Sequence, residues 1–210
     1  MNGKDSNWIK VLVQIAFCLL CYFLKDIIYF RPLMIKFSEP HISIANQLNS
    51  TAIKILLNSA YRGEASKKGW TTEAHLIAGD IRTDDATIKQ IIQQSGSVFL
   101  IYRNDSNAII GCVNLQKHDN KIYLSMFSVS PTEQSKNIGK KLLHAAEEYA
   151  KYLQCNAIYM SVISLRTELI SWYLRHNYKD TGVRTAFIED GITGKHMQPL
   201  TFMTLEKSLV

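Results

Sequence analysis

The feature of this sequence that most limits its fold is the change in hydrophobic spacing near residue 97. Upstream, apolar residues recur at helical spacing from Ile44 to Ala60. Downstream come three β-rich runs separated by turn signals and then an amphipathic helix, at Ser97 to Tyr102, Ile109 to Leu115, Lys121 to Val129 and Gly139 to Leu153. The rest of the pattern predicts a strand, a helix and two closing strands, at Ala157 to Ile163, Glu168 to His176, Thr185 to Ile188 and Leu200 to Leu205. This order predicts an α/β (α+β) domain with one mixed sheet and flanking helices.

The stretch before residue 97 is expected to hold two short helices after a polar loop. The loop is Tyr61 to Thr72, and Thr72 is suited to cap a helix that begins at Glu73. Asp84 or Thr83 is suited to cap a second helix that ends near Gln94.

Composition and charge limit the function. A chain of 210 residues, 47% of them hydrophobic, can bury one sizeable core. The net charge of +6 suits a phosphate-bearing ligand, but no dense Lys/Arg stripe interleaved with aromatics is present, so nucleic acid is not an expected partner. Cys18 and Cys21 form a C-x-x-C pair without the second pair that zinc needs, and we expect no metal site. The cysteines do not indicate an oxidising compartment, which favours the cytoplasm.

Residues 1–36 are expected to be a hydrophobic extension of a globular domain over residues 37–210. The uncharged run Val11 to Leu24 has fourteen residues, or about 21 Å of helix, against a bilayer core of roughly 30 Å. Adding Ile27 to Phe30 lengthens this run only by burying Lys25 and Asp26. A membrane anchor through residues 8–30, a dispensable extension and a docked amphipathic helix all remain open.

The segment that carries most of the chemistry runs from Leu124 to Leu143. A buried strand ends at Val129, the chain turns, and a helix begins over Gly139 with lysines at its start. Free amides at such a helix start, together with the helix dipole, can hold an anion. By itself the pattern fits a phosphate-binding turn and a plain strand-to-helix connection equally well.

Two sequence motifs, one in this segment and one near residue 175, resemble those of a known family. They are Val129-x-Pro131 followed by Gln134-x-x-Asn137-Ile138-Gly139-x-x-Leu142-Leu143, and Trp172-Tyr173-x-x-x-Asn177-Tyr178. The first resembles the acetyl-CoA signature of the GNAT N-acetyltransferases, usually Q/R-x-x-G-x-G/A, and the second is similar to the aromatic helix end of that family. The order of elements from about residue 41 to 210 matches as well. The resemblance implies a mostly antiparallel sheet in which the strands at 121–129 and 157–163 splay apart.

The resemblance also implies an activity and its residues. Acetyl-CoA would be the acyl donor, with its pantetheine arm on the backbone of Phe127 and Val129. Its diphosphate would lie on the turn, at Gln134, Ser135, Lys136, Asn137, Ile138, Gly139 and Lys140. A primary amine of a small molecule or peptide would attack directly, and Tyr173 would protonate the leaving thiolate. Glu73, ahead of His75, is the expected general base.

Two residues depart from the family pattern. Asn137 stands where glycine is common, and asparagine is the least costly substitute if that position needs positive φ. Arg166 stands where many members have an asparagine that touches pantetheine, so we expect it to reach a phosphate instead. If these departures mark lost turnover, the alternative is a non-catalytic acyl-CoA-binding module with the same fold. A weaker alternative is a membrane-tethered interaction protein.

Overall fold

A computed structural model describes residues 35–191 and 193–210, and its globular unit spans Phe37–Val210. Seven strands form one sheet in the order β1-β3-β4-β5-β6-β9-β7. Their bounds are β1 (Ile42–Ile44), β3 (Ser97–Arg103), β4 (Ile109–His118), β5 (Lys121–Val129), β6 (Ala157–Ile163), β7 (Lys179–Phe187) and β9 (Leu200–Ser208). The β5–β6 pair is parallel and the other neighbours in this sheet are antiparallel. The predicted mixed, mostly antiparallel sheet is confirmed.

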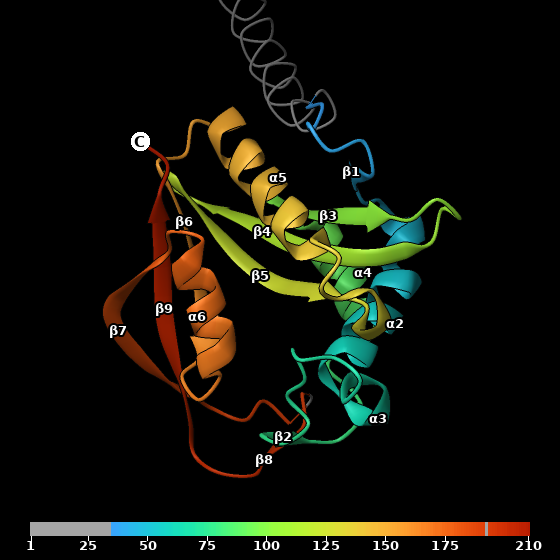
Figure 1. Ribbon diagram of the computed structural model, residues 1–210, viewed down its shortest axis with the longest axis vertical. Helices are drawn as coiled ribbons and strands as arrows, with labels where there is room; N and C mark the ends of the chain where they lie inside the picture. Colours follow the sequence, from blue (N-terminus) through green and yellow to red (C-terminus); the bar gives the residue numbers. More distant parts are fainter. Residues whose placement is uncertain (1–34, 192) are drawn as a thin grey trace, which may run out of the picture. The chain divides into compact units, whose positions relative to one another are not determined.

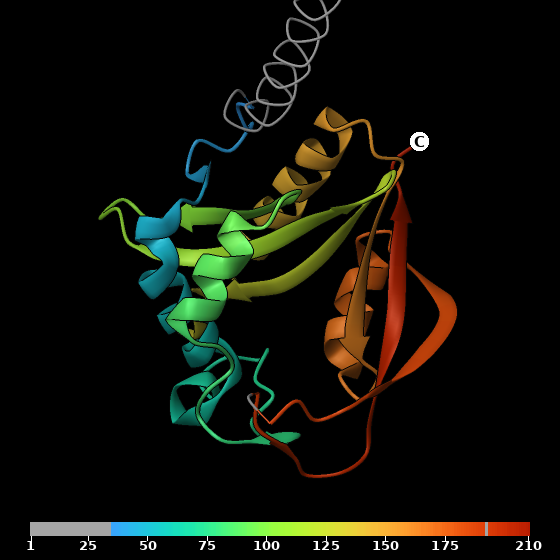
Figure 2. The same ribbon diagram turned by 180° about the vertical axis from the view of Figure 1, so that it is seen from behind.

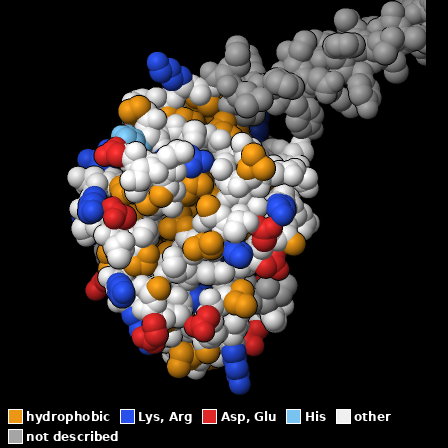
Figure 3. Space-filling model, turned by 90° about the vertical axis from the view of Figure 1, so that its right-hand side faces the viewer, with side chains coloured by type: hydrophobic (Ala, Val, Ile, Leu, Met, Phe, Trp, Pro, Cys, Tyr) orange, Lys and Arg blue, Asp and Glu red, His pale blue; other side chains and the backbone are white. Residues whose placement is uncertain are grey.

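Helices cover both faces of the sheet. They are α2 (Ser50–Tyr61), α3 (Gly63–Ser66), α4 (Asp85–Gln93), α5 (Ile138–Tyr152) and α6 (Thr167–Arg175). Helices α5 and α6 lie on the face toward the viewer in Figure 1, and α2 and α4 lie on the opposite face, seen in Figure 2. On the side of the molecule that Figure 3 presents, positive and negative side chains are interspersed around hydrophobic ones.

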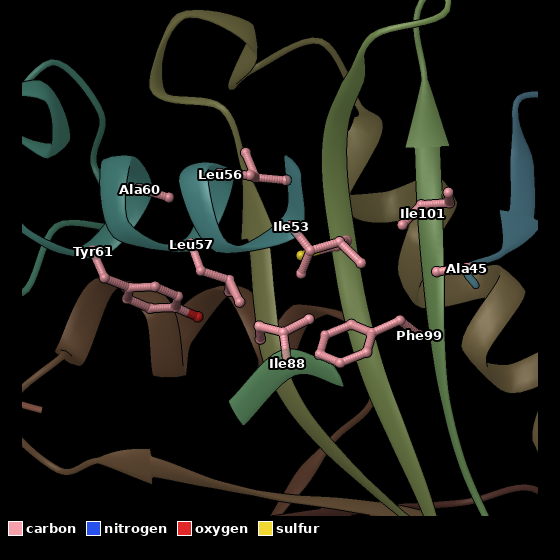
Figure 4. Close-up of a cluster of buried hydrophobic side chains, with 10 residues drawn as sticks. Ala45, Ile53, Leu56, Leu57, Ala60, Tyr61, Ile88, Phe99 and Ile101 are labelled. Carbon is pink, nitrogen blue, oxygen red and sulfur yellow. The ribbon is translucent and has the colours of Figure 1, made fainter. Parts of the chain in front are cut away.

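A hydrophobic cluster joins α2 and α4 to the sheet (Figure 4). Ile53 and Leu57 of α2 and Ile88 of α4 are fully buried against Phe99 of β3. Burying each such side chain contributes about 2 kcal/mol before the entropy of ordering it is subtracted. This packing explains why the apolar residues of α2 recur at helical spacing.

The first predicted helix begins later than expected. Ile44 belongs to β1. Leu48 and Ile55, part of the apolar spacing that predicted this helix, are 91% and 58% exposed, and Leu48 lies in the short 3-10 turn η2 (Gln47–Asn49). The Asn46 side chain accepts a hydrogen bond from the Leu48 amide and so starts a new element after β1.

The helix predicted at Glu73 is wrong. The chain makes one turn there, in which the Glu73 carbonyl accepts from the Leu76 amide at 2.8 Å and the Ile77 amide at 2.9 Å. It then enters β2 (Ile77–Ala78), which pairs with β8 (Lys195–His196). The predicted cap of the next helix is confirmed, since the Asp84 carboxylate accepts from the Thr87 amide at 2.7 Å.

Strands β5 and β6 part soon after they meet. Their register covers three pairs, ending at Tyr123 with Tyr159. Beyond that point β5 stays with β4 through a register shift, where Met126 takes a positive φ of 47°. Because a bulge bends its strand, this irregularity turns the end of β5 away from β6. The predicted splay of these two strands is confirmed.

The predictions for the N-terminal segment concern residues outside the described ones, including the apolar run Val11 to Leu24 and the pair Cys18 and Cys21. Within residues 35–191 and 193–210, no helix is both long and apolar enough to span a bilayer. The same residues contain no group of three or more His, Cys, Asp or Glu that could hold a metal ion.

Candidate active site

The turn between β5 and α5 carries a run of backbone amides without acceptors. A 3-10 turn, η3 (Pro131–Glu133), follows β5, and α5 begins at Ile138. Ser135 and Asn137 have positive φ, 65° and 63°, so Asn137 has the conformation expected of a residue that replaces glycine. Within the described part of the chain, no carbonyl or side chain accepts a hydrogen bond from the amides of residues 134–140. A cluster of unsatisfied amides at a helix N-terminus is suited to an anion.

The charges around this turn favour the same ligand. No acidic residue occupies the first turn of α5, although the helix dipole favours negative charge there. Lys141 is neutralised by Glu39 at 3.0 Å, and Lys136 pairs with Glu133 at 2.9 Å. Lys140 forms no ion pair with a described residue, and it lines the cavity beside the turn. An anion bound there would remove the repulsion between Lys140 and the helix dipole.

A cavity of about 440 Å³ lies between this turn and α6. Its walls come from the end of β5, the turn, the N-terminal part of α5, α6 and residues 70–71. Three aromatic rings pack around it: Phe127 lies 6.1 Å from Trp172 and 6.3 Å from Tyr173, measured between centroids. Most of the exposed lining is apolar, so the cavity offers a polar end at the amides and an apolar body.

A second, smaller cavity of about 120 Å³ occupies the gap between the parted strands. It is lined by residues of β5 from Tyr123 to Phe127 and of β6 from Met160 to Ile163. Both cavities are lined by Tyr61, Phe127, Arg166, Leu169 and Tyr173, so these residues form the wall that the two cavities share.

Tyr173 lies in the wall that the two cavities share, with its side chain 4% exposed. Burial raises the pKa of its phenol, because the phenolate would lose its hydration, and the nearby Tyr61 adds to this effect. The hydroxyl makes no hydrogen bond with any residue that the structure describes. It is therefore a protonated group that retains its donor capacity for a ligand.

Backbone groups at the end of β5 alternate between β4 and the gap. The Ser130 amide donates to Ile110 of the β4 side at 2.8 Å, so the groups of Val129 face the other way. Phe127 lies in the register shift of β5, and its carbonyl is turned toward Tyr61. Both carbonyls already have donors, since Tyr61 Oη lies 2.6 Å from the Phe127 oxygen and Gln134 Nε2 lies 3.2 Å from the Val129 oxygen.

Gln134 ties the anion-binding turn to the loop over the cavity. Its side-chain oxygen accepts from the Trp70 amide at 2.9 Å, and its nitrogen donates to Thr71 Oγ1 at 2.8 Å. Gly69 permits this approach, because a Cβ there would lie 2.7 Å from Gln134 Oε1. The sequence predicted only a ligand role for Gln134, since Trp70 and Thr71 are more than 60 residues away from it in the chain.

Glu73, the predicted general base, is held in buried ion pairs. One carboxylate oxygen lies 2.6 Å from Arg62 Nη1 and the other lies 2.8 Å from Arg166 Nη1. Arg62 is itself 2% exposed and also binds the carbonyl of Thr193. Because both oxygens already serve guanidinium groups, this arrangement does not suit proton abstraction from an acceptor amine.

Arg166, predicted to reach a phosphate, uses its two amino groups within the protein. Nη1 pairs with Glu73, and Nη2 donates to the Thr71 carbonyl at 2.6 Å. Its side chain is 8% exposed and lines both cavities. Arg166 therefore joins the start of α6 to Thr71 and Glu73. Because both of its amino groups are in use, this geometry argues against the predicted phosphate contact.

The sequence model of the acetyltransferase (GNAT) family matches residues 56–178. The chain belongs to this family. No curated protein matches the sequence significantly. Among solved structures, the GNAT fold recurs in an N-acetyltransferase from Staphylococcus aureus Mu50 (TM-score 0.62, 14% identity, 80% of this chain and 98% of that one). It also recurs in yncA of Salmonella typhimurium, solved with its cofactor acetyl-CoA (0.59, 17%, 80% and 93%), and in the ribosomal-protein-S18-alanine N-acetyltransferase of Escherichia coli (0.59, 10%, 80% and 92%).

The site of this GNAT protein fits an acyl-CoA by its own chemistry. The unsatisfied amides of residues 134–140 suit a diphosphate, and the apolar cavity next to them suits an extended arm with few charges. Sequence reasoning missed Trp172 and Tyr61 as parts of this site. Trp172 precedes Tyr173 in the second motif, whereas Tyr61 comes near Tyr173 only through the packing of α2 and α6 around β5, which no local pattern shows.

Proposed function

We propose that this protein transfers an acetyl group from acetyl-CoA to the primary amine of a small molecule or peptide. One observation carries the proposal: the unsatisfied amides of residues 134–140 and the protonated hydroxyl of Tyr173 border the same cavity. Acetyl-CoA supplies the acyl group as a thioester, which an amine can attack without a covalent enzyme intermediate.

The turn and the end of β5 bind and orient the donor in this proposal. The amides from Gln134 to Lys140 hold the diphosphate, and Lys140 adds a positive charge. The pantetheine arm lies along Phe127 and Val129, whose carbonyls are already hydrogen-bonded. Their N–H groups are therefore the groups left to bind the arm and to polarise the thioester carbonyl.

Tyr173 supplies a proton to the departing sulfur, and the proton that the attacking nitrogen loses as the amide forms restores the phenol. Its raised pKa keeps the hydroxyl protonated, and its place between the two cavities puts it beside the point where donor and acceptor meet. Glu73 is the single carboxylate among the residues that line the second cavity, and both of its oxygens are paired. We therefore assign Glu73 a positioning role and propose that the amine enters as the free base.

Release of CoA from acetyl-CoA over a panel of primary amines tests this proposal, with acetyl-CoA affinity measured in parallel. Turnover with at least one amine, and binding that is weakened by Asn137→Ala, support it. Binding of acetyl-CoA without release on any amine would instead support the non-catalytic acyl-CoA-binding module. If acetyl-CoA neither binds nor is turned over, the proposed donor site is wrong.

A further inference from the structure

The second cavity has an unusual charge content for a pocket that takes an amine. Its lining includes Arg82, Arg166 and Glu73. Glu73 also forms an ion pair with Arg62, which does not line the cavity. Two guanidinium groups, those of Arg62 and Arg166, pair with this one carboxylate, and that of Arg82 is a third at the same cavity. The residues that line the cavity thus carry two positive charges and one negative charge.

Arg82 is the guanidinium of this group that lacks an ionic partner. Arg62 and Arg166 are satisfied by Glu73 and by main-chain carbonyls. Arg82, in contrast, forms no ion pair or side-chain hydrogen bond with any residue in 35–191 or 193–210. Its guanidinium carbon lies 5.6 Å from the centre of the Tyr61 ring, which leaves the hydrogen-bonding edge of the group available.

The backbone holds Arg82 in place at the cavity. The Asn58 side chain of α2 accepts hydrogen bonds from the amides of Arg82 at 2.7 Å and Thr83 at 3.0 Å. It also donates to the Thr83 carbonyl at 3.0 Å. Three hydrogen bonds from one side chain fix the backbone of this segment, so the point from which the Arg82 side chain extends does not depend on a ligand.

We propose that the acceptor is a compact amine that also carries a carboxylate, and that Arg82 binds this carboxylate. The inference rests on the proposed acetyl transfer. A half-buried guanidinium without a partner favours a planar carboxylate, which it can bind through two hydrogen bonds. The same charge excess disfavours polycationic acceptors. A volume of about 120 Å³ is well below that of sites for drug-sized ligands, and walls such as Met160, Phe187 and Phe202 suit an apolar side chain.

Matched acceptor pairs test this assignment in the full-length protein. L-leucine and L-phenylalanine are compared with L-leucinamide and L-phenylalaninamide by kcat/KM for CoA release. The carboxamide amines are less basic and so lose their proton more readily, which means that a preference for the carboxylates cannot arise from amine basicity. We expect kcat/KM to be roughly 10-fold to 100-fold higher for the carboxylates, the range for one hydrogen-bonded charge contact.

Variants then assign the preference to a residue. Arg82→Gln is expected to abolish the preference for carboxylates by raising their KM, while acetyl-CoA affinity stays unchanged. Arg82→Lys should retain part of this preference. Arg103→Gln is the matched control, because Arg103 binds the Asn107 carbonyl at the β3–β4 hairpin and lines neither cavity. Equal kcat/KM for carboxylates and carboxamides, or a preference that survives in Arg82→Gln, would overturn the inference and leave the acetyltransferase proposal intact.

Binding without turnover separates the two proposals. Calorimetric titration of L-leucine and L-leucinamide into the protein with CoA present measures recognition alone. Binding of L-leucine that Arg82→Gln removes, with no turnover of any amine, would support the carboxylate site and reject acetyl transfer. No Arg82-dependent binding, together with no turnover, would reject both.

Discussion

The carboxylate of Glu73 accepts a hydrogen bond from Arg166 Nη1 at 2.8 Å, and both side chains are less than 10% exposed. These residues are 93 positions apart in the chain. The contact ties the loop after α3 to the start of α6, and the second guanidinium on the same carboxylate, from Arg62, extends it to α2. The floor of the site is thus held by a buried ionic cluster.

Removing the carboxylate should therefore destabilise the fold. Glu73→Ala leaves two buried guanidinium groups without their shared partner and is expected to lower the free energy of unfolding by about 3 kcal/mol. Glu73→Gln, which keeps one acceptor, should cost less. Urea denaturation measures both, and Glu64→Gln, whose pair with Lys67 is exposed, should change stability by less than about 0.5 kcal/mol. Loss of turnover in Glu73→Gln with unchanged stability would restore the general-base role.

Tyr173→Phe should lower kcat and spare donor binding. The substitution keeps the ring contacts with Trp172 and Tyr178 but removes the proton donor, so kcat is expected to fall roughly 100-fold with the Kd of acetyl-CoA unchanged. Tyr178→Phe is the matched control, because its buried hydroxyl has no hydrogen-bond partner in the described structure and lines neither cavity. Wild-type kcat in Tyr173→Phe would exclude the acid role.

The pH dependence of kcat gives a second test of the same residue. Burial raises the pKa of Tyr173 above its ordinary value of 10.0, so the acid form is present through neutral and mildly alkaline pH. Deprotonation of the amine should make kcat rise with pH, and no fall due to Tyr173 is expected below pH 10. A fall in kcat centred near pH 8 that disappears in Tyr173→Phe would contradict the raised pKa of Tyr173.

Gly69→Ala should act through Gln134. The added Cβ would meet the Gln134 side chain at 2.7 to 2.9 Å and displace it from Trp70 and Thr71. Loss of these hydrogen bonds is expected to lower the free energy of unfolding by about 1 to 2 kcal/mol. In a Gln134→Ala background the same change should cost almost nothing. Equal costs in both backgrounds, measured by a double-mutant cycle, would show that Gly69 acts otherwise.

Asn137 provides a test of backbone strain at the turn. Asn137→Gly should leave stability and acetyl-CoA affinity unchanged or improved, because glycine adopts a φ of 63° without a Cβ penalty. Asn137→Ala should lower the free energy of unfolding by about 1 kcal/mol and weaken acetyl-CoA binding. Thermal unfolding with and without acetyl-CoA measures both effects. An Asn137→Ala protein that matches the Asn137→Gly protein would show that the turn does not need this conformation.

Local patterns predicted the elements that carry the donor site, and they failed where distant residues decide the structure. Strands β5 and β6 have the predicted bounds, and the left-handed conformation of Asn137 followed from its place in the motif. The turn at Glu73 was predicted as a helix from its capping threonine. The Glu73 side chain instead forms ion pairs with Arg62 and Arg166, and Arg166 comes from a distant part of the chain. A local pattern also could not show the hydrogen bonds of the Gln134 side chain with Trp70 and Thr71, which come from a distant loop.

Hydrogen exchange at the turn tests whether the amides of residues 134–140 bind the diphosphate of acetyl-CoA. Amides of residues 134–140 have no acceptor in the described structure, so they should exchange quickly in the free protein. Saturating acetyl-CoA should slow their exchange, and pantetheine, which lacks the diphosphate, should not. If acetyl-CoA binds and the exchange of these amides is unchanged, residues 134–140 do not hold its diphosphate.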